Sequence, residues 1–185
     1  MVGMGQSKAA RLSRGQSLRF FLYILALFLG TLAVHEAAHV LAVLALGVPV
    51  SELKFGFYGI HPSITLPEHL AGTQQAIVYY AGGLTTGIIL LVLYLCYFRR
   101  RYRAAPSMFR WLLGLVTVIF AGMQLAMGYL EGCYHHVYVI GAGTLFSVTD
   151  IVVSGWAVSA ALLHFVLCPW RKMKTGAVTG HRQSD

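Results

Sequence analysis

The sequence predicts an all-α polytopic membrane protein with about four transmembrane helices and a short hairpin or edge strand in the first outer connection. Three observations predict this class. The 185-residue chain has a mean hydropathy of +0.68 and only 11% charged residues, which is too apolar for an ordinary soluble domain. Its apolar residues gather into four long runs, and its basic residues gather outside them.

The four apolar runs cover residues 20–48, 76–98, 111–131 and 137–169. Each reaches the roughly 20 residues that a helix needs to cross the hydrocarbon core. Since the first and last runs exceed one crossing, we expect them to tilt, to extend beyond the bilayer or to contain a break.

The basic residues indicate topology rather than a nucleic-acid surface. All but one of the 14 Lys and Arg residues lie in three clusters outside the apolar runs, and with the six Asp and Glu residues they give the chain a net charge of +8. Such clusters mark cytoplasmic segments, so both termini and the 99–110 loop are predicted to be cytoplasmic. We therefore expect the lipid bilayer, and no nucleic acid, as a partner. The clusters are Lys8, Arg11, Arg14 and Arg19, then Arg99, Arg100, Arg101, Arg103 and Arg110, then Arg171, Lys172, Lys174 and Arg182.

The same distribution predicts three parts of the chain. Residues 1–19 form a basic cytoplasmic N-terminal segment, residues 20–170 form one membrane-embedded domain, and residues 171–185 form a basic cytoplasmic tail. The length allows one compact domain and no more.

A metal-ligand pattern lies inside the first apolar run. His35, Glu36 and His39 form H-E-x-x-H, and helix positions i and i+4 share one face, so both imidazoles can reach one ion. A catalytic Zn²⁺ site adds a third protein ligand, and Glu36 can act as the general base toward a water molecule. Unpaired His and Glu are costly inside a membrane, which favours a functional origin for the pattern.

The surroundings of this motif resemble a known family. HEAAHVLAVLALGVPV resembles the first core helix of the site-2-protease type of intramembrane zinc metalloproteases. AIVYYAGGLTTGIILLVLYL resembles the second core helix of that family, and GTLFSVTDIVV resembles a Ser-Val-x-Asp-Ile stretch in a small membrane branch of the same clan. The similar stretches are residues 33–50, 76–92 and 140–152, about a quarter of the chain.

The third metal ligand has two candidates. In the family it is usually an Asp in an Asn-x-x-Pro-x-Pro-x-x-Asp-Gly pattern, whereas this chain has MQLAMGYLEGCYHH, with Glu131-Gly132 and neither proline. Glu131 has the following glycine in its favour, and Asp150 has the Ser-Val-x-Asp-Ile resemblance. The predicted spans place both acids at the same depth as the histidines. Gln124, in the third run, is expected to hydrogen-bond toward this site or to a neighbouring helix.

The connection over residues 49–75 begins with alternating side chains, with Leu53, Phe55 and Phe57 on one side and Lys54 and Tyr58 on the other. This period of two predicts the short hairpin or edge strand. In the resembling family, such a strand lies beside the metal and holds the substrate extended. An ordinary lid loop is the alternative.

The resemblance implies a zinc metalloendopeptidase that hydrolyses peptide bonds within or beside transmembrane segments of another membrane protein. Zn²⁺ on His35, His39 and an acid would be its cofactor, and Glu36 its catalytic base. The alternatives are a non-catalytic membrane protein with a structural or binding metal site, and a metal-dependent hydrolase of a lipid or small molecule. The family places its metal near the cytosol, whereas the charges here place it toward the opposite face. The substrate, the cleavage site and the oligomeric state do not follow from the sequence.

Overall fold

A computed structural model of the chain describes residues 12–58, 61–67, 70, 72–134 and 148–169. Four of its helices are long and apolar enough to cross a membrane, and a two-stranded antiparallel hairpin follows the first of them. The predicted fold class is confirmed. The elements are α1 (Arg14–Ala45), a 3₁₀ turn η1 (Val50–Glu52), β1 (Lys54–Tyr58), β2 (His61–Thr65), α2 (Thr73–Leu93), a π-helical turn η2 (Tyr94–Phe98), α3 (Arg99–Ala104), α4 (Met108–Tyr134) and α5 (Val148–Leu167).

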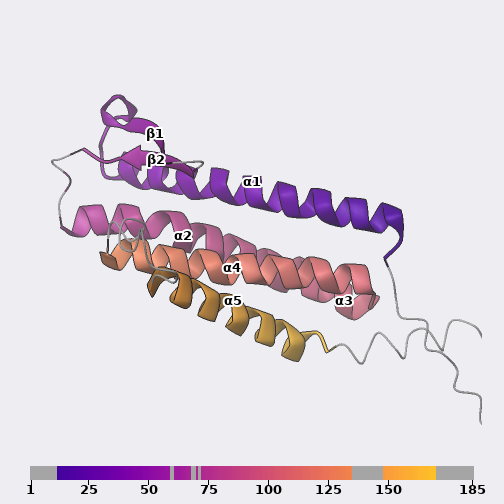
Figure 1. Cartoon of the computed structure of the whole chain (residues 1–185). Helices are drawn as coiled ribbons and strands as arrows, with labels where there is room; N and C mark the ends of the chain where they lie inside the picture. Colours follow the sequence, from indigo (N-terminus) through magenta and orange to yellow (C-terminus); the bar gives the residue numbers. More distant parts are fainter. Residues whose placement is uncertain (1–11, 59–60, 68–69, 71, 135–147, 170–185) are drawn as a thin grey trace, which may run out of the picture.

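The helices run side by side, with α2 and α4 at the centre of the bundle (Figure 1). Helix α1 packs mainly on α2 from one side, and α5 packs on α4 from the other. One end of the bundle, here called the hairpin end, holds β1, β2, the start of α2 and the last turns of α1 and α4. The other, the basic end, holds the start of α1, the end of α5 and α3 with its arginines.

Helices α2 and α4 cross where neither has a side chain. A Cβ atom added to Gly83 would overlap the backbone nitrogen of Gly128, and one added to Gly128 would overlap the backbone nitrogen of Leu84. Lipid supplies no hydrophobic drive for helix association, so close backbone packing at small residues takes its place. This crossing fixes the register of α4 against α2.

Buried polar contacts hold the basic end together. The indole of Trp111 donates to the carbonyl oxygen of Cys168 at 2.9 Å, and the Tyr102 hydroxyl donates to that of Pro169 at 2.9 Å. These bonds satisfy carbonyls at the end of α5, where the helix itself leaves acceptors unpaired. Tyr94 of η2 contacts His164 Nδ1 at 3.0 Å and completes the link between α2 and α5.

The ends of the spans differ from the predicted ones for local reasons. Helix α1 begins at Arg14 because Ser13 and Gln16 form a capping box, in which each side chain accepts from the other residue's backbone N–H. The second span continues through the arginines of α3, which are good helix formers, and ends just before Pro106. Helix α5 begins at Val148, and residues 137–147 of the predicted fourth span lie outside the described residues, as does the predicted tail.

Candidate metal centre

Only a narrow stripe of side chains on helix α1 packs against the rest of the bundle. Leu27 and Thr31 are buried on it, and His35 and His39 follow at the next two steps of four residues. The same step leads to Val43, which is fully buried against the hairpin. Most other apolar side chains of α1 are exposed, as expected of a helix that faces lipid. The spacing of the pattern therefore turns both imidazoles inward.

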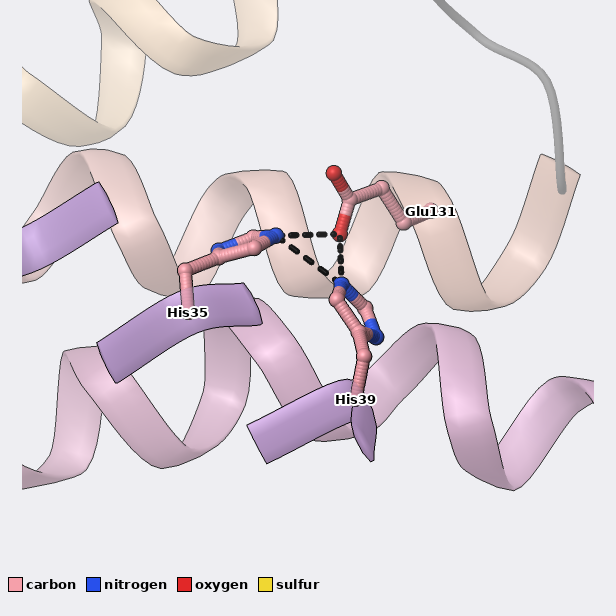
Figure 2. Close-up of side chains that lie close together, drawn as sticks. All are labelled: His35, His39 and Glu131. Carbon is pink, nitrogen blue, oxygen red and sulfur yellow. Dashed lines mark hydrogen bonds and ion pairs between the residues drawn. The ribbon is translucent and has the colours of Figure 1, made fainter. Parts of the chain in front are cut away.

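Three side chains converge at this place (Figure 2). His35 Nε2 and His39 Nε2 lie 3.0 Å apart, and Glu131 Oε2 lies 3.4 Å from the first and 3.9 Å from the second. Each side chain is 12% exposed. The histidines come from α1 and the glutamate from the last turns of α4, so the cluster joins two helices that share little other contact.

The far nitrogen of each imidazole is already bonded. His39 Nδ1 lies 2.7 Å from the carbonyl oxygen of Val78 in α2, and His35 Nδ1 lies 2.9 Å from Gln124 Oε1 in α4. A carbonyl oxygen can only accept, so the two Nδ1 atoms donate, and in neutral imidazoles both Nε2 atoms then present lone pairs. The ligating nitrogens of metal-bound histidines are oriented in this way.

A positive charge between the three converging atoms would satisfy them together. Both Nε2 atoms present lone pairs, and Glu131 Oε2 is buried with no hydrogen-bond partner among the described residues. Such groups are costly in an apolar interior unless a cation or donor satisfies them. A single proton satisfies one of the three contacts, whereas one metal ion can satisfy all three.

The spacing of the donor atoms fits zinc. Bonds of roughly 2.0–2.1 Å at tetrahedral angles place the ligand atoms about 3.3 Å apart, and the three distances here are 3.0, 3.4 and 3.9 Å. Two imidazoles with one carboxylate form a ligand set of catalytic zinc sites, in which the fourth position takes water or substrate. Ca²⁺ and Mg²⁺ prefer oxygen ligands, so the two nitrogens disfavour them.

Helix α2 packs against the two imidazole rings at Gly82. A Cβ atom there would overlap His39 Nε2 and would lie 2.7 Å from His35 Nε2. Tyr80 packs on Gly132, the residue after Glu131, at the same level. The glycines of the second apolar run thus provide space for the imidazoles as well as for the helix crossing.

The predicted catalytic base Glu36 lies beside the cluster but outside it. It follows His35 on α1, is partly buried, and is not one of the three side chains that converge. A carboxylate that borders a metal centre without ligating it is the arrangement that general-base catalysis requires.

The structure separates the two candidates for the third ligand. In the described part of the chain, the group with metal-ligand spacing consists of His35, His39 and Glu131. Asp150 is exposed in the first turn of α5, at the same end of the bundle, and is not part of this group. Sequence reasoning did not foresee the roles of Gly82 and the Val78 carbonyl. The sequence signal for Gly82 was a glycine in the apolar run that follows the H-E-x-x-H run. The sequence holds no signal for the bond to the Val78 carbonyl, because every residue has a backbone carbonyl.

The hairpin lies directly beside this centre. Strands β1 and β2 pair antiparallel from Lys54↔Thr65 to Tyr58↔His61. Its supporting core contains Val43, one turn after His39, and Val78, whose carbonyl accepts from His39. Neither strand pairs with a third strand among the described residues. The hairpin and helix α1 thus share one hydrophobic core.

The fold and site define a helical protein of the multi-pass membrane class, with a buried group of two histidines and a glutamate near one end of its bundle. Comparison with protein-family models, with curated proteins and with solved structures gave no match for this chain.

Proposed function

We propose that the protein is a zinc metalloendopeptidase that hydrolyses peptide bonds within or beside the transmembrane segments of other membrane proteins. The observation that carries this proposal is the convergence of His35 Nε2, His39 Nε2 and Glu131 Oε2, with both Nδ1 atoms already bonded. The proposal assigns the third ligand to Glu131 rather than to Asp150. Glu36, beside the cluster, supplies the base that a purely structural metal site does not need.

Each residue has one task in this reaction. His35, His39 and Glu131 would hold the ion, which when bound would polarise the scissile carbonyl and lower the pKa of a water molecule toward neutral. Glu36 accepts a proton from the attacking water and delivers it to the leaving amine. The hydrogen bonds that His39 donates to the Val78 carbonyl and His35 donates to Gln124 keep the two imidazoles in the orientation that ligation requires.

The hairpin suggests how a substrate is presented. A helical peptide keeps its carbonyls in i to i−4 hydrogen bonds, whereas an extended peptide added to a strand edge exposes alternate groups. The unpaired strand edges lie on the element that shares its core with the metal-ligand helix. A substrate segment unwound along this edge would pass next to the centre.

The proposal includes the orientation in the membrane. Basic clusters mark the cytoplasmic side, so we infer that the basic end and both termini are cytoplasmic and that the hairpin end faces the opposite side. His35 follows Arg19 by 16 residues of continuous helix, which is about 24 Å of rise. The catalytic centre then lies in the outer half of a hydrocarbon core roughly 30 Å thick.

The test compares wild type with Glu36→Gln in membranes of cells that lack the endogenous protein. Both proteins should purify with about one zinc per chain when no chelator is used, because Glu36 is not a ligand. Only the wild type should generate new N-termini within or beside transmembrane segments, measured by mass spectrometry of protein N-termini. Zinc in both proteins with no difference in N-termini would contradict the protease proposal and favour a binding or structural site. Glu36-dependent turnover of lipid without peptide cleavage would favour a lipid hydrolase.

A further inference from the structure

We propose that Gln124 is a positioning residue, which fixes the tautomer of His35 and thereby sets the affinity of the centre for its metal ion. This inference rests on the proposed metal centre, and it concerns a residue that is not itself a ligand. It follows from the different partners that the two histidines have at Nδ1.

Gln124 lies two helical turns before Glu131 on α4, and its Oε1 atom is 2.9 Å from His35 Nδ1. One face of α4 thus supplies both the acidic ligand and the partner of an imidazole on α1. The close crossing of α2 and α4 supports this placement, because a Cβ added to Gly83 would lie 2.5 Å from the Gln124 backbone carbonyl oxygen. The backbone of Gln124 therefore lies at the same helix crossing that sets the register of α4.

The two histidines differ in how firmly their tautomers are fixed. The partner of His39 is a backbone carbonyl, which can only accept, so His39 Nε2 always presents its lone pair while His39 is neutral. The partner of His35 is a primary amide, which accepts through oxygen and donates through nitrogen. His35 can thus exist in two tautomers, and the orientation of the Gln124 side chain selects between them.

The two orientations have opposite consequences for metal binding. When the amide oxygen accepts from His35 Nδ1, as the structure shows, His35 Nε2 has a free lone pair for the ion. When the amide nitrogen donates instead, the proton moves to Nε2, from where it can bond to His39 Nε2 at 3.0 Å. The second arrangement closes a hydrogen-bonded chain from Gln124 through both imidazoles to Val78 and competes with the metal ion.

This account predicts different effects for two substitutions. Gln124→Glu supplies an acceptor of the same length, so it should hold His35 in the Nδ1–H tautomer and bind zinc at least as tightly as wild type. Gln124→Leu removes the acceptor at similar size, so zinc affinity should fall about 10–100-fold, the usual effect of losing such a partner. Gln74→Leu, at an exposed position in the first turn of α2, is the matched control and should leave the affinity unchanged.

The experiment uses the full chain purified in detergent, with Zn²⁺ titrated against a chromophoric chelator. Nitrogen-15 spectra of histidine-labelled, metal-free protein give the tautomer of His35. In wild type and Gln124→Glu we expect the Nδ1–H tautomer, and in Gln124→Leu a mixture. Circular dichroism identifies any variant that fails to fold, in which case the comparison of wild type with Gln124→Glu carries the test.

Each contrary result has its own meaning. Gln124→Leu with wild-type zinc affinity and an unchanged His35 tautomer would overturn the role of Gln124 and leave the metal centre standing. So would a folded Gln124→Glu variant with the Nε2–H tautomer or much weaker zinc binding. If wild type itself bound no zinc, the proposed metal centre would fall, whatever the variants did.

Discussion

The centre depends on which atoms carry protons. His35 and His39 each direct one nitrogen outward to an oxygen acceptor and the other inward to a shared point. Glu131 adds a buried oxygen without a hydrogen-bond partner among the residues that the structure describes. The proposed ion needs all three of these side chains, so single substitutions can test the ligand assignment.

The first prediction concerns the third ligand. Glu131→Gln keeps the size of the side chain but removes its negative charge, so zinc affinity should fall by more than the roughly 10–100-fold that loss of a partner outside the ligand set causes. Asp150→Asn should leave the affinity unchanged, because Asp150 is not part of the cluster. Chelator competition measures both. Strong zinc binding by Glu131→Gln together with weak binding by Asp150→Asn would transfer the ligand role to Asp150.

The second prediction concerns the glycine behind the imidazoles. Gly82→Ala introduces a methyl group that overlaps His39 Nε2, so the rings must move apart and stoichiometric zinc binding should be lost. Gly30→Ala is the control, since a Cβ there has no neighbour within 4 Å on the described residues. Metal content after purification without chelator gives the answer. A zinc-loaded Gly82→Ala protein would show that the rings do not occupy the position described.

At the scale of elements, the crossing of α2 and α4 connects packing to the site. Gly83 and Gly128 let the two backbones touch, and Glu131 follows Gly128 by one turn. Any increase in the separation of the helices moves Glu131 and Gln124 away from α1 together. The crossing therefore determines whether the acid reaches the histidines.

The third prediction tests this coupling. Gly83→Ala should force the helices apart, because its methyl group would overlap the Gly128 backbone, and overpacking of this kind costs about 1–3 kcal/mol. Zinc affinity should fall together with thermal stability, although no ligand is changed. Gly155→Ala on α5, where a Cβ has no neighbour within 4 Å, should change neither. A destabilised Gly83→Ala variant with full zinc affinity would show that the crossing of α2 and α4 does not determine the geometry of the proposed centre.

Sequence could predict the elements but not their register. Four apolar runs of sufficient length and one period-two segment give the helices and the hairpin, because each signal is local. The H-E-x-x-H spacing likewise brings His35 and His39 to one face of one helix. Glu131 and Asp150 lie on different helices at similar predicted depth, so only the rotation of those helices, set by contacts such as Gly83 against Gly128, distinguishes them. The hydrogen bond from His39 to the Val78 carbonyl could not be predicted for the same reason.

At the scale of the whole molecule, charge divides the bundle along its length. The arginines of α3 and the first turns of α1 lie at the basic end. The last turns of α4, which carry Glu131, and the first turn of α5, which carries Asp150, lie toward the hairpin end. With the basic end in the cytoplasm, the proposed centre would lie toward the outer side, opposite to the arrangement in the site-2-protease type that the sequence resembles. Substrates would then be cut in the outer half of the bilayer.

The last prediction tests this orientation with the cysteines that the chain already has. Cys133 is exposed two residues after Glu131, at the hairpin end, whereas Cys96 is exposed on η2 near the basic end and Cys168 is buried. A membrane-impermeant maleimide added to intact cells should label wild type but not Cys133→Ser, because only Cys133 lies toward the outside. Labelling of Cys133 only after the membrane is opened would place the hairpin end in the cytoplasm. The centre would then have the orientation of the resembling family, and the basic clusters would have failed as a guide to topology.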